Sequence, residues 1–218
     1  MRPLFPALAA ALALAVAGLA VPLASRMAER RGAVALLELP VGREYAADVA
    51  AWRARAEAAT PGVPRSWFPV DERFRVVASF AFYETPQVVL LKTTSGATTA
   101  VEIPGHLEFE FDRATYRLLP FWPDGGTRMQ VLFLDETSGD GSWPEGRVVE
   151  ADFPGGREAA SIIAGQAAEG AIIPPIPIVL DFNMAVNPPC AHDAGGACLL
   201  PPAENTLPVA VSAGERQP

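Results

Sequence analysis

The stretch that decides the fold is His106-Leu107-Glu108-Phe109-Glu110-Phe111-Asp112, in which apolar and polar residues alternate without a break. Successive side chains of a strand point to opposite faces, so Leu107, Phe109 and Phe111 share one face. This pattern predicts a strand with one buried side and one solvated side, which is typical of antiparallel sheets. Residues 115–121 follow after a short turn and are predicted to pair with it.

Further runs rich in β-branched and aromatic residues lie on both sides of this strand. They cover residues 74–83, 87–94, 98–103, 129–134, 147–153 and 178–182, with Gly- and Pro-rich turns between most of them. Such spacing predicts a mainly β fold, an antiparallel sandwich or a barrel-like domain. Residues 154–177 interrupt the series with a Pro-rich segment and are predicted to be an insertion, in which residues 158–169 are a candidate short helix.

One helix is predicted before the strands, over residues 44–59. Tyr45, Val49, Trp52 and Ala56 follow one another at steps of four and three residues, so they share one face of an amphipathic helix. Thr60-Pro61-Gly62 ends it. We expect this helix to pack on the domain and to take no part in chemistry.

The N-terminal residues 1–25 are almost uncharged and apolar, which is typical of a signal peptide or a membrane anchor. We therefore expect an extracytoplasmic protein that is secreted, periplasmic or N-terminally anchored, with residues 26–62 as linker and helix and 63–216 as the β domain. An alternative follows from Arg26, Arg30 and Arg31, because positive charge after an uncleaved apolar helix favours a domain that faces the cytoplasm. In either case the membrane is contacted through the N-terminal segment alone.

Composition and motifs exclude some classes of function. The 218-residue chain carries a net charge of −8, and such an acidic domain repels the phosphates of nucleic acids. The sequence contains no Gly-rich phosphate loop, no nucleophile elbow and no metalloprotease helix motif. We therefore expect no nucleic-acid partner and no cofactor.

The C-terminal part of the chain resembles a known bacterial family. The runs LDFNMAVNPPCA at 180–191, CLLPPAEN at 198–205 and LPVAVSAGE at 207–215 are similar to the end of the DUF1684 family, a domain of unknown function. Similar segments occur at 68–78 and 133–139. Met184, Val186 and Leu199 depart from the family pattern, which usually has Arg, an aromatic residue or His, and Pro there. The resemblance implies no activity.

The two cysteines, Cys190 and Cys198, are predicted to form a disulfide, since that is the usual state of a close pair in an oxidising compartment. A less specific alternative is a metal site that uses Cys190, His192 and Cys198. Its spacing fits no standard zinc motif.

Polar residues near these cysteines form a candidate ligand-binding set, which consists of Asp181, Asn183, Asn187, Glu204, Asn205 and Arg147. The structural interpretation is that these side chains cap turns and brace the backbone. The functional interpretation is a pocket for non-catalytic binding of a small polar ligand or an envelope partner. An envelope hydrolase or lyase that uses acids such as Asp181 and Glu204 is an alternative, and a metal-binding domain is another.

Overall fold

The computed structural model describes residues 40–123, 126–192 and 196–217. The predicted leader at 1–25 lies outside this part of the chain. Among the described residues, no helix has both the length and the apolar character needed to cross a membrane.

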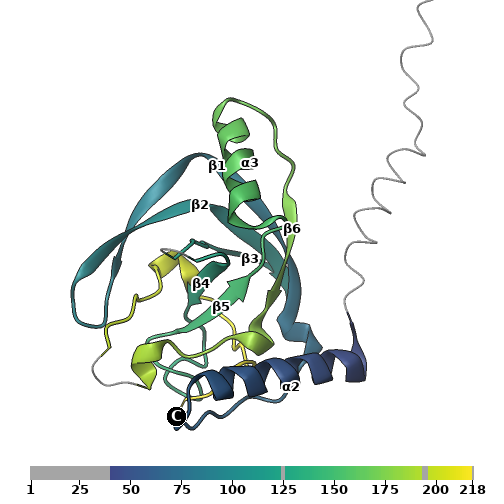
Figure 1. The fold of residues 1–218 in the computed structure, drawn as a ribbon, viewed down its shortest axis with the longest axis vertical. Helices are drawn as coiled ribbons and strands as arrows, with labels where there is room; N and C mark the ends of the chain where they lie inside the picture. The colour runs from purple at the N-terminus through teal and green to yellow at the C-terminus, as the bar shows by residue number, and fades with distance from the viewer. Residues whose placement is uncertain (1–39, 124–125, 193–195, 218) are drawn as a thin grey trace, which may run out of the picture. The chain divides into compact units, whose positions relative to one another are not determined.

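A four-stranded antiparallel sheet and a separate hairpin form the centre of the domain (Figure 1). The sheet has the order β3-β2-β1-β6, with β1 at Arg75–Lys92, β2 at Thr98–Phe111, β3 at Ala114–Leu118 and β6 at Ile176–Asp181. The hairpin pairs β4, Met129–Phe133, with β5, Arg147–Ala151. Short 3₁₀ turns lie at Glu72–Phe74, Phe182–Met184, Pro189–Ala191 and Ala203–Asn205.

The alternating stretch lies in β2 and pairs with β3, as predicted. Leu107 lies opposite Leu118 and Phe109 opposite Tyr116 in an antiparallel register. The connecting residues Asp112 and Arg113 both have positive φ, 49° and 67°, which is the conformation of a tight two-residue hairpin turn. Leu107 and Phe109 are buried, so the predicted apolar face is the core face.

The two longest strands each join two segments that the sequence suggests as separate strands. The β1–β2 register shifts between Phe82 and Gln87, and Gly105 lies opposite Phe82. A Cβ at Gly105 would lie 2.1 Å from the carbonyl oxygen of Ala81, so a side chain there would force the strands apart. Beyond this point, both strands curve around the β4–β5 hairpin (Figure 1).

The hairpin packs against two hydrophobic clusters as a result. Met129, Val131 and Phe133 join the main core with the inner face of the sheet. Leu132 points the other way and belongs to a second cluster that includes Leu91 and Ile103 from the far halves of β1 and β2. The same bent sheet therefore contributes residues to two separate hydrophobic clusters, one on each side of the hairpin.

The predicted fold class needs correction in two respects, although antiparallel pairing is confirmed. Among the described residues, the fold is mixed α/β, with two α-helices and no closed barrel. The second helix, α3 at Gly156–Ala168, occupies much of the stretch predicted as an insertion. The β4–β5 hairpin packs with the sheet in the main core, instead of closing a barrel with it.

The predicted N-terminal helix is confirmed as α2, Gly42–Ala59. Tyr45 and Val49 are buried, and Trp52 and Ala56 are partly buried along the same face. The Tyr45 hydroxyl donates to both carboxylate oxygens of Asp181, at 2.9 and 3.0 Å. This contact fastens α2 to the end of β6.

Candidate functional site

A cavity of about 810 Å³ lies between α2 and the edge of β5. Its walls are mostly apolar and include Trp52, Ala56, Val63, Val148, Met184 and Val186. Val148 of β5 and Val186 exchange two backbone hydrogen bonds of 2.8 Å, so the segment after β6 continues the wall beside the hairpin.

Four polar residues in or next to this wall contact one another, and we call them the floor cluster: Arg65, Asn187, His192 and Glu215. Arg55, Thr60, Gln130 and Glu150 are the other polar residues of the lining. Of the floor cluster, the first three line the cavity, and the Glu215 side chain is fully buried in contact with them. Its Oε2 accepts from Arg65 Nη1 at 2.6 Å and from the Asn187 backbone N–H at 2.9 Å. The cluster joins residues 150 positions apart in the chain.

The charges of the floor cluster balance within it. Burial raises the pKa of Glu215, while the Asn187 N–H, Arg65 and His192 oppose that rise. The guanidinium of Arg65 is nearly buried and pairs directly with the carboxylate, so the two charges cancel. His192 Nε2 lies 3.2 Å from Glu215 Oε1, which makes an ion pair when the imidazole is protonated, but neither atom forms a hydrogen bond with the described residues.

Asn187 has a fixed orientation at this floor. Its Nδ2 donates to the carbonyl oxygen of Arg216 at 2.8 Å, which determines which side-chain atom is nitrogen and which is oxygen. The residue is 2% exposed. Its Oδ1 is buried and accepts no hydrogen bond from the described residues.

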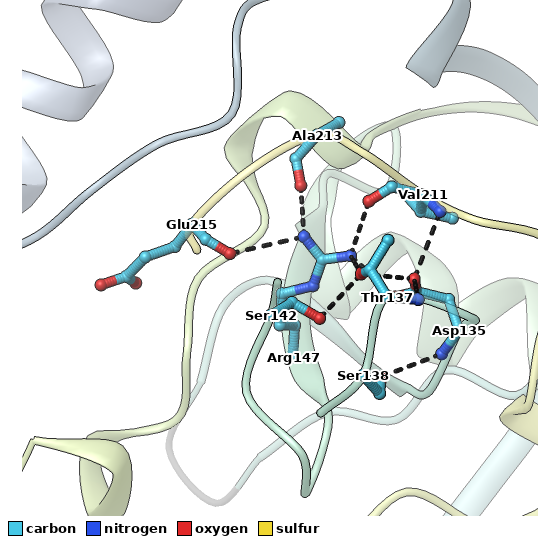
Figure 2. Close-up of polar contacts among 8 residues, drawn as sticks. All are labelled: Asp135, Thr137, Ser138, Ser142, Arg147, Val211, Ala213 and Glu215. Carbon is cyan, nitrogen blue, oxygen red and sulfur yellow. Dashed lines mark hydrogen bonds and ion pairs between the residues drawn. The ribbon is translucent and has the colours of Figure 1, made fainter. Parts of the chain in front are cut away.

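A second buried cluster, around Arg147, holds the segment that carries Glu215 (Figure 2). Arg147 Nη2 donates to Asp135 Oδ2 at 2.7 Å and to the Val211 carbonyl at 2.8 Å. Its Nη1 donates to the carbonyls of Ala213 and Glu215. Both side chains of the Arg147–Asp135 ion pair are fully buried.

Asp135 completes this brace. Its Oδ1 accepts from the Thr137 hydroxyl at 2.6 Å, the Thr137 N–H at 2.8 Å and the Val211 N–H at 3.2 Å (Figure 2). Burial lowers the pKa of Arg147, and the negative charge of Asp135 opposes that shift. The described contacts thus satisfy both oxygens of the carboxylate.

Gly214 allows the chain to turn from the brace into the floor cluster. Its φ is +77°, and a Cβ there would lie 2.6 Å from the carbonyl oxygen of Ala185. The next residue, Glu215, then donates its backbone N–H to that same oxygen at 2.8 Å. Close approach of this kind requires glycine.

The structure brings one of the six predicted binding residues, Asn187, to the cavity. Asn183 donates to the Tyr45 hydroxyl and to the Asp71 carbonyl, both at 2.8 Å. Asp181 accepts from Tyr45, and burial raises its pKa while Tyr45 and Asn183 oppose that rise.

Two more of the predicted residues lie elsewhere. Asn205 links two chain segments, because its Nδ2 donates to the carbonyls of Leu119 and Leu132 at 3.0 and 2.7 Å. Glu204 is exposed. With Arg147 in the brace, most of this set makes the backbone and turn contacts of the structural interpretation.

The sequence pattern pointed to neither Arg65 nor Glu215 as a site residue. Glu215 lies in the quoted run LPVAVSAGE, which marked the segment but not its chemistry. Arg65 lies in a loop with no motif, and only its ion pair with Glu215 reveals it.

The predicted disulfide is confirmed, since Cys190 and Cys198 are joined with their Cα atoms 5.8 Å apart. Their sulfurs are therefore not available as thiolates for the metal alternative with His192. Within the described ranges, no group of three or more His, Cys, Asp or Glu side chains is arranged to hold a metal ion.

These features define a mixed α/β domain with a mostly apolar cavity and a polar floor. The chain belongs to the family described as "Protein of unknown function (DUF1684)", whose pattern matches residues 64–216. A solution NMR structure of an uncharacterized protein from Haloarcula marismortui is similar, with 28% sequence identity and a TM-score of 0.53. That match covers 78% of this chain and 96% of the archaeal one. No curated protein matches this chain.

Met184 and Val186, which the sequence analysis set apart from the pattern of the family that the chain resembles, both line the cavity and contribute to its apolar walls.

Proposed function

We propose that this domain is a non-catalytic binding module, which takes a small and largely apolar ligand with one polar group in the cavity beside α2. The observation that carries the proposal is the cavity itself, about 810 Å³ with mostly apolar walls and a few polar residues among them. Small-molecule sites typically measure about 300–1,000 Å³ and combine apolar walls with a few placed polar groups. The sequence analysis predicts a small polar ligand, whereas the mostly apolar walls favour an amphipathic one.

The residues that line the cavity favour binding over catalysis. Covalent catalysis needs a nucleophile next to a base. The one hydroxyl among the described lining residues, that of Thr60, donates to the Ala56 carbonyl and accepts from Arg65. Neither Asp181 nor Glu204 lines this cavity, so the acids suggested for a hydrolase or lyase are not placed to act there.

We propose further that the domain works outside the cytoplasm. The Cys190–Cys198 disulfide supports this, because disulfides persist in oxidising compartments and are rare in the cytosol. The apolar leader predicted at 1–25 supports it as well. Mass measurement on protein from the envelope or medium should show an oxidised pair, whereas two free thiols on a membrane-bound chain would favour the cytoplasm-facing alternative.

Binding can be measured at a methionine that lines the cavity. With ¹³C-methyl-labelled methionine, titration of octan-1-ol, octanoate or octylammonium should shift the Met184 signal. The Met129 methyl provides an internal control, since Met129 is fully buried in the main core. If none of the three probes moves the Met184 signal, the binding proposal is wrong.

A matched pair of variants locates the binding. Ala56→Trp places a large side chain in the cavity and should abolish the Met184 response. Ala54→Trp puts the same side chain on an exposed position of the same helix and should leave it intact. Equal responses in both variants would place the probe elsewhere.

A further inference from the structure

We infer that the ligand of this cavity is an amphipathic anion, a carboxylate with an apolar tail, and that Arg55 pairs with its head group. This inference rests on the proposed function and names the class of ligand for the same cavity. It depends on which charged residues of the lining already have a partner and which one does not.

The first step is that Arg55 lies on the face of α2 that borders the cavity. Four residues of this helix, spaced three and four positions apart, belong to the lining: Trp52, Arg55, Ala56 and Ala59. Residues at this spacing share one side of a helix. Arg55 is exposed, whereas Trp52 and Ala56 are partly buried. A head group beside Arg55 therefore keeps part of its hydration while its tail lies against the apolar walls.

The second step is that Arg55 has no counterion. Within the part of the chain that the structure describes, its side chain makes no ion pair and no hydrogen bond. The positions three and four residues away on either side are the ones that face it on a helix, and none is acidic: Ala51, Trp52, Ala58 and Ala59. Its positive charge is therefore available to a ligand.

The third step is that the other charged residues of the lining already have partners. Arg65 forms an ion pair of 2.6 Å with the buried carboxylate of Glu215, and His192 lies beside that same carboxylate. Glu150 accepts a hydrogen bond of 2.8 Å from Arg128 Nη1. Arg55 thus differs from each of them.

The group around Arg128 retains one negative charge, because this guanidinium also donates to both carboxylate oxygens of Asp152, at 2.6 and 2.9 Å. That charge is shared with Asp152, whose side chain is 75% exposed and does not line the cavity. A cationic head group would leave Arg55 unbalanced, whereas a carboxylate pairs with it. Water screens an exposed pair, so we expect a preference of several-fold and not of many orders of magnitude.

The test compares octanoate, octylammonium and octan-1-ol, with dissociation constants taken from the Met184 methyl shift of the full-length protein at neutral pH and 0.1 M salt. We expect octanoate to bind about fivefold more tightly than octylammonium, as an exposed ion pair allows. Arg55→Gln should bring the two dissociation constants close together, and Arg55→Glu should reverse their order. The affinity for octan-1-ol should not change, because this probe is uncharged.

Arg43→Gln is the matched control. Arg43 is also exposed on α2, but it does not line this cavity. It lies about 18 Å from Arg55 along the helix axis. That separation exceeds the screening length of about 10 Å at 0.1 M salt. The preference for octanoate should therefore persist in this variant.

The outcomes separate the two proposals. If octylammonium binds the unaltered protein at least as tightly as octanoate, or if the two Gln variants lose the preference equally, the head-group inference is wrong while the binding module stands. If no probe binds, the binding module itself is wrong. An unchanged Met129 signal verifies that a variant is folded. If Arg55→Gln does not fold, the three probes on the unaltered protein and on Arg43→Gln still decide.

Discussion

Two buried charged clusters share the same five-residue segment, Val211 to Glu215, and they differ in how completely their polar atoms are hydrogen-bonded. Around Arg147, the ion pair with Asp135 is joined by hydrogen bonds to the Val211 and Ala213 carbonyls. Around Glu215, three buried atoms lack hydrogen-bond partners among the described residues: Asn187 Oδ1, His192 Nε2 and Glu215 Oε1.

The difference indicates two roles. Satisfied networks stiffen a core and specify its geometry. Unsatisfied buried polar atoms are rare in native proteins and call for an explanation, such as a bound ligand. The Arg147 cluster also leaves Nε of Arg147 without a hydrogen-bond partner among the described residues, but Arg147 does not line the cavity. We therefore regard the first cluster as a brace and the second as a less completely hydrogen-bonded cluster beside the proposed binding cavity.

The largest expected effect comes from breaking the brace with Arg147→Met. Asp135 would remain fully buried without its cation, which typically costs about 3–5 kcal/mol of unfolding free energy. Urea unfolding followed by tryptophan fluorescence measures this loss. Combining Arg147→Met with Asp135→Leu removes the orphaned charge as well, so the double variant should recover part of the stability. A double variant no more stable than the single one would contradict the brace.

A smaller effect is expected from removing the disulfide with Cys190→Ser and Cys198→Ser. Closing a loop of this length contributes about 2–3 kcal/mol by restricting the unfolded chain. His192 lies within the loop, so affinity for octan-1-ol should fall as well. Reductant added to the unaltered protein should reproduce both losses. Unchanged affinity in the reduced protein would show that the loop does not position the floor cluster.

The smallest effect is a change in pH dependence in Glu215→Gln. Burial raises the pKa of Glu215 above its ordinary value of 4.5, so the folded state holds a proton that the unfolded chain releases. This contribution to stability is complete below pH 4.5 and is lost as the pH rises through the raised, folded value. The Glu215→Gln variant lacks this contribution. The unfolding free energy of the unaltered protein minus that of the variant should therefore decrease as the pH rises.

Unfolding of both proteins across the acidic range measures this difference. The raised pKa of Asp181 acts in the same direction, but it is common to both proteins and cancels. If this difference instead grows with pH, the ion pair with Arg65 lowers the pKa of Glu215 by more than burial raises it. The floor cluster would then resemble the brace, and the comparison between the two would fail.

Local patterns predicted much of the fold. The alternation at 106–112 gave a strand and its correct partner, because a strand with one buried face leaves a period of two in the sequence. The spacing of Tyr45, Val49, Trp52 and Ala56 predicted α2 and its inner face for the same kind of reason. The curvature at Gly105 was not predictable, because it depends on how closely β1 approaches β2.

The candidate site was predicted only in part. Asn and Asp residues near the C-terminus were recognised as a polar set, yet residue type alone does not distinguish Asn205, which links backbone segments, from Asn187, which lines the cavity. Both are buried amides. Their difference is whether every amide atom has a partner, and that is a property of the neighbours.

The sequence by itself determined the antiparallel strands, the first helix, the cysteine pair and the family, because each of these is written in residues close together in the chain. Tertiary structure alone decided that Arg65 meets Glu215, that Arg147 binds the carbonyls of a distant segment, and that a cavity lies between α2 and β5. The physical reason is that hydrophobic periodicity acts over a few residues, whereas hydrogen-bond satisfaction and cavity shape depend on which distant segments the folded core brings into contact.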